Sequence, residues 1–472
     1  MPIQPISISE DFSSLDLNPA LLETLAHLNY TQMTPIQAQS LPELLAGTDV
    51  IARAHTGSGK TAAFALTILN RLNLKFFAAQ AMVLCPTREL ALQVSQAIRE
   101  LARAMPNVKV VLLAGGSPMH AQLDSLSHGG HVIVGTPGRV QKHLDKGSLN
   151  LQHLSVLVLD EADRMLDMGF LESIQNIVKK CPKERQTLLF SATYPAEIPA
   201  LSNAGMRKPK EIFIEQEQVS DDLQQIFYTV TADQHFQTLT TILNHYASSP
   251  TLIFCNTKKR ITEIVTSLKR AGFCALSLHG DMEQMDRDLA MVQFANQSCS
   301  ILVATDVAAR GLDIKFLPLV INYELAYDCE VHTHRIGRTG RAGQSGLAIS
   351  LITHEDACRV LLIENAQGKA ISLGDLADLS KKPRVAVTPP MITLCLNIGR
   401  KQKLRAGDIL GALTKDAGLA ADMIGKIDVL ATRSYVALQA SQAKKACDHL
   451  NAGKVKGQSV NATLLYISNH HG

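Results

Sequence analysis

The chain has 472 residues and a mass of 51.2 kDa, which corresponds to about three domains of ~150 residues. Its residues are 46% hydrophobic and 19% charged, a composition that supports buried cores and excludes a mostly disordered or collagen-like chain. The first 52 residues contain no Lys or Arg, and no apolar run reaches about 18 residues, so we expect neither a secretory signal nor a membrane span.

The nine cysteines are an odd number, lie far apart and never form C-x-x-C. This pattern argues against a disulfide framework and against a zinc ribbon. We therefore expect a cytoplasmic protein with no membrane partner.

The net charge of +3 is unevenly distributed. Residues 391–472 contain 11 Lys or Arg against 5 Asp or Glu, which makes this segment basic while the rest of the chain is slightly acidic. Such asymmetry suggests that the C-terminal segment contacts nucleic acid.

In the first part of the chain, short β-rich apolar runs alternate with helical patterns. The runs are 50–54, 81–85, 108–113, 132–135, 156–159 and 187–190. Strands buried on both faces lose the alternation of polar and apolar residues, so the pattern predicts a parallel sheet covered by helices on both sides. We expect this first α/β domain to span residues 1–208 and a linker to span 209–222.

The same pattern begins again after the linker. The runs are 225–230, 251–255, 274–278, 301–304, 319–322 and 347–352. They predict a second α/β domain at 223–368, followed by a basic, proline-containing linker at 369–390.

The C-terminal segment, 391–466, has the order strand, helix, strand, strand, helix, strand, before a short tail at 467–472. The expected elements are strand 392–397, helix 406–416, strands 425–430 and 435–439, helix 443–450 and strand 460–465. This is the element order of the RNA-recognition-motif fold, an α+β fold.

A glycine-rich loop follows the first apolar run, in the sequence Ala54-His-Thr-Gly-Ser-Gly-Lys-Thr61. Between a strand and a helix, its backbone N–H groups and Lys60 can bind phosphate, and the Thr61 hydroxyl can bind Mg²⁺. Ala54 occupies the place of the usual first glycine, and a glycine turn before a helix is the structural alternative. The predicted ATP contacts here are Thr56, Gly57, Ser58, Gly59, Lys60 and Thr61.

An acidic segment, Asp160-Glu-Ala-Asp163, follows the buried run 156–159. At the carboxyl end of a strand beside a phosphate loop, Asp160 would hold Mg²⁺ mostly through water, and Glu161 would orient the attacking water. The alternative is a helix start with acidic residues in its first turn.

Together with these motifs, the chain resembles the DEAD-box ATP-dependent RNA helicases, over about residues 10–360. The resemblance implies two tandem RecA-like parallel-sheet domains. It further implies that Gln37 of Thr34-Pro-Ile-Gln37 reads the adenine and that Phe12 covers its ring. Without the resemblance, these residues would be interpreted as a turn and a core phenylalanine.

The same resemblance assigns RNA contacts and residues that couple the ATP and RNA sites. The RNA contacts in the first domain are Pro86, Thr87, Arg88, Gly116, Thr136 and Arg139. The coupling residues are Asp163, Ser191, Thr193 and His334, and we expect the segment Ser191-Ala-Thr193 to hydrogen-bond to Asp163. Taken individually, each RNA segment could be an ordinary strand-to-helix loop, and Ser191-Ala-Thr193 could be a helix N-cap.

In the second domain, Arg335, Arg338 and Arg341 recur at a spacing of three, which would place them on one face of a loop entering a helix. Such guanidinium groups suit a γ-phosphate presented by another domain. The resemblance identifies Arg338 and Arg341 as arginine fingers. It also implies that Thr305 and Arg287 bind RNA and that Asp306 binds the ribose of ATP. For the three arginines, a solvated basic helix start is the alternative.

Residues 391–466 include the stretches Arg405-Ala-Gly-Asp-Ile-Leu-Gly-Ala-Leu413 and Gly453-Lys-Val-Lys-Gly457. With these stretches the segment resembles the C-terminal domain of DbpA-type helicases, and the resemblance implies recognition of structured ribosomal RNA. The expected sheet lacks the usual aromatic pair and offers only Tyr435 on its third strand. We therefore expect binding through basic loops, above all Arg400, Lys401 and Lys403, with Lys454 and Lys456 as a second group.

These observations predict an RNA-dependent ATPase and RNA helicase that uses ATP and Mg²⁺ and unwinds short duplexes. Its expected partners are 23S ribosomal RNA and the pre-50S ribosomal particle, and we expect a monomer. A non-enzymatic, ATP-gated RNA clamp and a DNA translocase are the competing hypotheses.

Overall fold

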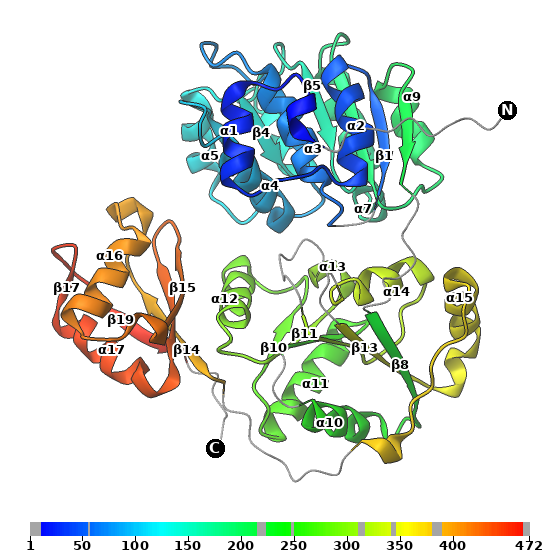
Figure 1. Cartoon of the computed structure of the whole chain (residues 1–472), viewed down its shortest axis with the longest axis vertical. Helices are drawn as coiled ribbons and strands as arrows, with labels where there is room; N and C mark the ends of the chain where they lie inside the picture. Colours follow the sequence, from blue (N-terminus) through cyan, green and yellow to red (C-terminus); the bar gives the residue numbers. More distant parts are fainter. Residues whose placement is uncertain are drawn as a thin grey trace. The chain divides into compact units, whose positions relative to one another are not determined.

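The computed structural model describes residues 11–54, 57–214, 223–246, 250–309, 317–340, 346–379 and 389–465 (Figure 1). By its internal contacts the chain forms two compact units. Unit 1 contains Met1–Glu217 with Gly311–Asp313, and unit 2 contains Gln218–Arg310 with Ile314–Gly472. None of the helices in these described ranges is long and apolar enough to cross a membrane.

Unit 1 is built on a seven-stranded parallel sheet in the order β3-β4-β2-β5-β6-β1-β7. The strands are β1 Val50–Arg53, β2 Ala81–Leu84, β3 Val110–Leu113, β4 Val132–Gly135, β5 Val156–Leu159, β6 Gln186–Ser191 and β7 Lys210–Phe213. The helices are α1 Pro19–His27, α2 Pro35–Ala46, α3 Lys60–Arg71, α4 Arg88–Leu101, α5 Met119–Ser127, α6 Pro137–Asp145, α7 Ala162–Asp167, α8 Leu171–Lys180 and α9 Ile198–Gly205, with a 3₁₀ turn at Phe12–Ser14.

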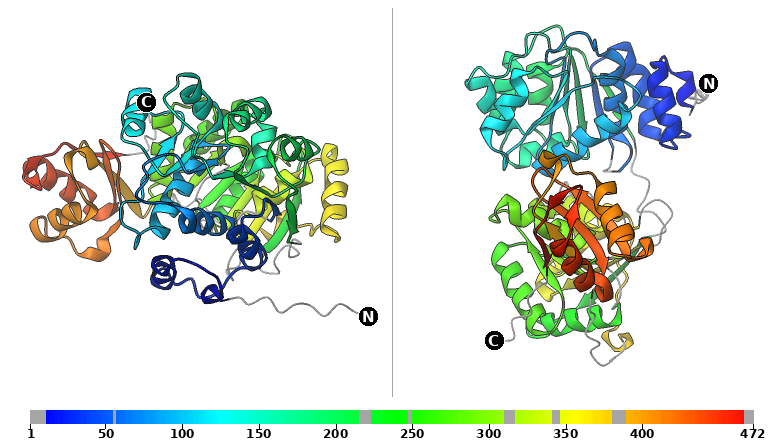
Figure 2. Two further views of the ribbon diagram at one scale, coloured as in Figure 1. Left: turned by 90° about the horizontal axis from the view of Figure 1, so that it is seen from above. Right: turned by 90° about the vertical axis from the view of Figure 1, so that its left-hand side faces the viewer.

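Helices cover both faces of this sheet, as the side views show (Figure 2). Successive residues of one strand enter different cores: Val50 and Ala52 pack in one cluster and Ile51 packs in the other. Because both faces are buried, the strands need apolar residues at every position. The α/β fold class predicted for this part of the chain is confirmed.

The first domain is longer than we expected from its sequence. Strand β7 pairs in parallel with β1, Val50 opposite Lys210 and Arg53 opposite Phe213. The predicted boundary at residue 208 and the predicted linker start at 209 are therefore wrong. Strand β7 is an edge strand in which only Ile212 is buried, so it lacks the continuous apolar run that identified the other strands.

Unit 2 begins with a six-stranded parallel sheet in the order β10-β11-β9-β12-β13-β8. The strands are β8 Leu223–Thr229, β9 Thr251–Phe254, β10 Ala275–Leu278, β11 Ile301–Ala304, β12 Leu319–Asn322 and β13 Gly346–Ile352. The helices are α10 His235–His245, α11 Lys258–Arg270, α12 Gln284–Ala295, α13 Asp306–Ala309, α14 Cys329–Ile336 and α15 Ala357–Gln367.

The segment after α15 also belongs to this domain. Leu373 forms a bridge with Phe227 of β8, and Leu379 is buried in the core of the six-stranded sheet. The predicted domain end at residue 368 is therefore too early. Residues 380–388 of the predicted linker lie outside the described residues.

The last part of unit 2 is a small α+β domain with a four-stranded antiparallel sheet in the order β15-β16-β14-β19. Its elements are β14 Met391–Leu396, α16 Ala406–Gly411, β15 Ile424–Val429, β16 Ser434–Gln439, α17 Ala440–Ala452 and β19 Ala462–Leu465, with a hairpin of β17 Lys454–Val455 and β18 Gln458–Ser459. The predicted element order is confirmed, with this hairpin added.

Candidate functional site

The phosphate loop of unit 1 joins β1 to α3, and its glycines are required by their surroundings. Gly59 has a φ of 95°, and a Cβ atom there would lie 2.4 Å from Nε2 of Gln37. The backbone can therefore turn into α3 only without a side chain at this position. Gly57 to Thr61 have the predicted strand, loop and helix setting, whereas Thr56 lies outside the described residues.

The segment predicted to read adenine is fastened directly to this loop. Gln37 is 1% exposed, and its Nε2 donates to the carbonyl oxygen of Gly59 at 3.0 Å while its Oε1 accepts from the Thr34 amide at 2.9 Å. The Thr34 hydroxyl donates to the carbonyl of Ser58 at 2.7 Å. The segment predicted to read adenine and the loop predicted to hold the phosphates are therefore joined by direct hydrogen bonds.

Phe12 does not present a ring face in this structure. It is 3% exposed and packs edge-on against Tyr30, with ring centroids 6.2 Å apart and planes at 76°. Tyr30 is 39% exposed. Phe12 thus packs against Tyr30, an aromatic residue that sequence reasoning missed. Tyr30 lies only four residues before Thr34, so its place near the predicted adenine segment could have identified it.

Acidic and basic groups gather beside the phosphate loop. Lys60 is buried and donates from Nζ to the Ala54 carbonyl at 2.7 Å. Burial and the neighbouring charge of Glu161 raise the pKa of Asp160 to about 7, although the charge of Lys60 opposes this shift. A buried carboxylate of this kind gains from a bound cation.

The oxygen ligands present suit Mg²⁺. The Thr61 hydroxyl and the Asp160 carboxylate are hard donors, which this ion prefers. In the described part of the chain, no cluster of three His, Cys, Asp or Glu side chains could hold a metal by itself. Mg²⁺ is usually bound through one or two carboxylates and its substrate's phosphates.

Glu161 has an unusual backbone conformation. Its φ of 51° and ψ of 54° lie in the left-handed region, although it carries a side chain and begins helix α7. Residues held in such conformations cluster at functional sites. Asp160 and Glu161 therefore follow the end of β5 as consecutive residues, and the backbone is left-handed at the second of them.

Asp163 links the acidic segment to the end of β6. Its carboxylate accepts hydrogen bonds from the amides of Ala192 and Thr193 at 3.1 and 2.9 Å and from the Thr193 hydroxyl at 3.0 Å. The expected contact between these two segments is present, and the Ser191 hydroxyl also accepts from the Asp163 amide at 3.3 Å. Burial raises the pKa of Asp163, but Arg164 and the donated hydrogen bonds leave it below its usual value.

The RNA residues predicted in unit 1 follow β2, β3 and β4 at their carboxyl ends. Thr87 caps helix α4, accepting from the Leu90 amide at 3.2 Å, and Pro86 precedes it. Gly116 is exposed with a φ of 73°, and Thr136 precedes α6. Carboxyl ends of parallel strands meet at one edge of a sheet, so these loops share the edge that carries the phosphate loop.

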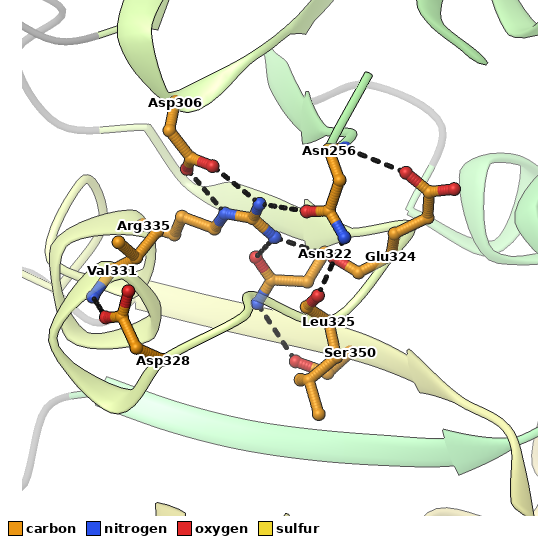
Figure 3. Close-up of polar contacts among 9 residues, drawn as sticks. All are labelled: Asn256, Asp306, Asn322, Glu324, Leu325, Asp328, Val331, Arg335 and Ser350. Carbon is orange, nitrogen blue, oxygen red and sulfur yellow. Dashed lines mark hydrogen bonds and ion pairs between the residues drawn. The ribbon is translucent and has the colours of Figure 1, made fainter. Parts of the chain in front are cut away.

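In unit 2, Arg335 is 1% exposed and lies at the centre of a polar network (Figure 3). Its Nε and Nη2 donate to the two carboxylate oxygens of Asp306 at 2.6 and 2.8 Å. The guanidinium group also donates to Asn256 Oδ1 and to the Glu324 carbonyl, both at 2.6 Å. Arg335 thereby ties helix α14 to the ends of β9, β11 and β12.

This network corrects the predicted setting of Arg335. Arg335 lies in the last turn of helix α14, which ends at Ile336 before Arg338, rather than on a loop that enters a helix. Arg335 points into the domain, Arg338 follows the helix, and Arg341 lies outside the described residues. His334 is in the last turn of α14.

The remaining predicted contacts in unit 2 occupy two places. Thr305 directly follows β11, and Arg287 lies in the first turns of α12. Asp306 was expected to bind ribose, but both of its oxygens are engaged by Arg335, so a ribose would have to share them.

We predict that replacing Arg335 with Met destabilises unit 2 strongly. Removing one partner leaves the Asp306 carboxylate and two strand-end oxygens without their donor, which costs about 3–5 kcal/mol for a buried ion pair. Thermal and urea unfolding of the full chain measure the loss. Lys258→Met is the matched control, because Lys258 pairs with Asp281 at the exposed surface of the same unit and its loss should cost less than about 1 kcal/mol. Equal losses in the two variants would contradict the prediction.

The sheet of the small C-terminal domain is partly covered by the preceding domain. Thr393 of β14 is fully buried, and its hydroxyl is 2.6 Å from the Ser298 hydroxyl and accepts from Asn296 Nδ2 at 3.2 Å. Tyr435 of β16 is buried as well. The sheet face with which RNA-recognition motifs usually stack bases is therefore not free at these positions.

A basic groove of about 650 Å³ lies instead at one end of this domain. Arg400, Lys403 and Arg405 line it together with the apolar side chains of Leu404, Ile427 and Val429, among others. Lys401 is exposed next to it. The Lys456 ammonium group donates to the Lys403 carbonyl at 2.6 Å and to Asp408 at 3.1 Å, so it fixes the loop.

Comparison with known proteins identifies the family. Residues 34–201 match the DEAD/DEAH box helicase family, residues 234–343 match the helicase conserved C-terminal domain, and residues 393–464 match the DbpA RNA binding domain. The chain is 49% identical to the ATP-dependent RNA helicase DbpA of Escherichia coli, over 96% of the chain and 99% of that protein. The chain belongs to the DEAD-box ATP-dependent RNA helicases of the DbpA type.

Other relatives agree with this assignment. The DbpA helicase of Bacillus subtilis is 35% identical over 95% of the chain and 98% of its own length. Among solved structures, S. cerevisiae Dbp5 bound to RNA and ADP BeF3 has a TM-score of 0.72 at 30% identity, covering 78% of the chain and 97% of Dbp5. The two parallel-sheet domains are RecA-like, and the protein is an ATP-dependent RNA helicase that binds ATP and RNA.

Proposed function

We propose that this helicase is an RNA-stimulated ATPase that locally unwinds short duplexes and is recruited by its C-terminal domain to structured 23S ribosomal RNA in the pre-50S particle. The observation that carries the recruitment is the basic groove, which remains open while the sheet face is covered at Thr393. Basic and apolar side chains that line one groove suit a phosphate backbone with an unstacked base.

The residues around the phosphate loop support the ATPase part of the proposal. Lys60 would contact phosphate, and Thr61 with Asp160 would hold Mg²⁺, which supplies charge to neutralise the phosphates when bound. Glu161 would position the attacking water. Tyr30 would stack on the adenine beside Gln37, since it is the exposed ring of this segment.

Arginines from unit 2 would complete the reaction. Arg338 and Arg341 would stabilise the charge that develops on the γ-phosphate when both units close on ATP and RNA. Asp163, Thr193 and His334 would couple this closure to RNA bound at the edge of each sheet. The closed state would hold one RNA strand bent, which expels its partner from a short duplex.

The competing hypotheses make different predictions. A non-enzymatic clamp would use ATP stoichiometrically, whereas the groups present at the site support repeated turnover. The ATPase activity of a DNA translocase would be stimulated by DNA. An ATPase assay with matched DNA and RNA strands tests this hypothesis. A monomeric state and a cytoplasmic location remain predictions, measured by light scattering and by cell fractionation.

Replacing Arg400, Lys401 and Lys403 together with Ala tests the recruitment. We expect weaker binding to ribosomal RNA and a flatter salt dependence, because each lost phosphate contact lowers the slope by roughly 0.7–0.9 units. The matched control replaces Lys415, Lys444 and Lys445, which are exposed in the same domain and do not line the groove. Sequencing of RNA cross-linked to the intact protein identifies the target. Wild-type affinity and slope in the groove variant would refute the proposed site.

A further inference from the structure

Behind the RNA-side loops of unit 1 lies a buried amide, Gln122 of helix α5, which is 4% exposed. Its Nε2 donates to the Ala114 carbonyl at 2.8 Å. Its Oε1 accepts from Arg139 Nη1 at 3.1 Å and is 2.9 Å from His143 Nε2. One side chain thus joins the loop after β3 to two residues of helix α6.

The partners determine the orientation of this amide. A guanidinium group can only donate and a carbonyl can only accept, so the amide oxygen must face Arg139 and the amide nitrogen must face Ala114. His143 Nε2 must therefore carry a hydrogen and donate to Gln122. Burial first, and then the charges of Arg139 and Lys146, lower the pKa of His143, which favours the neutral ring. The contact with Gln122 Oε1 then places the hydrogen of that neutral ring on Nε2.

The network determines the position of groups at the RNA edge. The nitrogen of Arg139 that contacts Gln122 also donates to the Ser117 carbonyl at 3.1 Å, and the Arg139 side chain is only partly buried. Arg88 donates to the Gly115 carbonyl at 3.2 Å in the same loop. Helix α6 is held from the other side, because His143 Nδ1 lies 2.9 Å from the Ser148 hydroxyl.

We propose that Gln122 and His143 are positioning residues for RNA binding by unit 1. They do not touch RNA; they hold Arg139 and the loop at Ala114 to Ser117 in the geometry that receives the RNA backbone. This inference rests on the proposed RNA contact of Arg139. A guanidinium group can form a two-point contact with a phosphate only when its own orientation is fixed. The buried amide of Gln122 should therefore affect RNA affinity as well as packing.

The test measures RNA-stimulated ATPase activity of the full chain carrying Gln122→Leu. We expect the RNA concentration for half-maximal stimulation to rise about tenfold, the equivalent of one buried hydrogen bond. Turnover at saturating RNA and the KM for ATP should remain within about twofold, since the ATP groups are untouched. His143→Leu should act in the same direction, and His143→Gln should restore near wild-type RNA dependence, because its amide nitrogen can replace Nε2 as the donor.

Gln80→Leu is the matched control. Gln80 is buried in the same unit and makes three hydrogen bonds of 2.7 to 2.9 Å to Asn73 and Phe76, but it precedes β2 and lies at the opposite end of that strand. It should lower the unfolding temperature as Gln122→Leu does, without shifting RNA half-saturation. Equal shifts in the two variants, or none in Gln122→Leu, would overturn the positioning role.

Arg139→Ala separates this inference from the proposed function on which it rests. If Arg139→Ala weakens RNA stimulation and Gln122→Leu does not, the contact holds and the positioning role is wrong. If Arg139→Ala has no effect, the proposed contact is wrong. The positioning role is then supported only if Gln122→Leu still shifts RNA half-saturation, through the loop that begins at Ala114.

Discussion

Replacing Arg338 with Ala should abolish most RNA-stimulated ATP hydrolysis. An arginine that reaches the γ-phosphate in the transition state contributes about a thousandfold or more to turnover in phosphoryl-transfer enzymes. Arg338 lies two residues after the end of helix α14, whose orientation Arg335 fixes through contacts at the ends of β9, β11 and β12. A steady-state ATPase assay at saturating RNA measures the loss.

Binding measurements distinguish a catalytic loss from a folding defect. Arg338→Ala should retain binding of ribosomal RNA through the C-terminal domain and a wild-type unfolding temperature. The matched control is Arg270→Ala, which removes an exposed arginine from the last turn of α11 in the same unit. Near-normal turnover in Arg338→Ala would refute a mechanism that needs groups from both units.

Replacing Glu161 with Gln should stop hydrolysis while ATP and RNA remain bound. The amide keeps the size of the side chain but cannot take a proton from the attacking water, and a general base contributes about 100-fold to 10,000-fold. The phosphate and metal groups, Lys60, Thr61 and Asp160, are unchanged. The protein should therefore accumulate in a closed complex, measured as slow release of single-stranded RNA in the presence of ATP.

The control for this variant is Glu172→Gln, which alters an exposed glutamate in the first turn of α8. It should hydrolyse ATP and release RNA at wild-type rates. Fast RNA release from Glu161→Gln in ATP would contradict the role assigned to Glu161, because a protein that binds both ligands and cannot hydrolyse ATP can reopen only by releasing ATP unhydrolysed.

The sequence could predict two kinds of feature. These are interactions that are local in the chain and interactions between the ends of neighbouring buried strands. The runs 132–135, 156–159, 301–304 and 319–322 coincide with β4, β5, β11 and β12, because strands buried on both faces are apolar at every position. The contact of Asp163 with Thr193 could also be predicted, since each follows one of two strands that pair directly.

Prediction from apolar runs failed for segments that are largely exposed at the edges of the domains. Strand β7 was missed because its sequence Lys-Glu-Ile-Phe buries only Ile212, so it resembles a polar turn until β1 is placed beside it. The predicted linker after α15 failed for a similar reason. Leu373 and Leu379 are too widely spaced to predict an element, and only the tertiary structure shows that they contact the second domain.

The sequence by itself determined the family and the parallel sheets, and it located the motifs proposed for the ATP site, because these depend on periodicity and on short motifs. The tertiary structure decided which of several chemically similar side chains are buried and which are exposed. Arg335 and Arg338 are three residues apart, yet only the former is buried against Asp306, and Phe12 is buried while Tyr30 is exposed. Burial depends on which distant segments pack together, and neither residue type nor spacing contains that information.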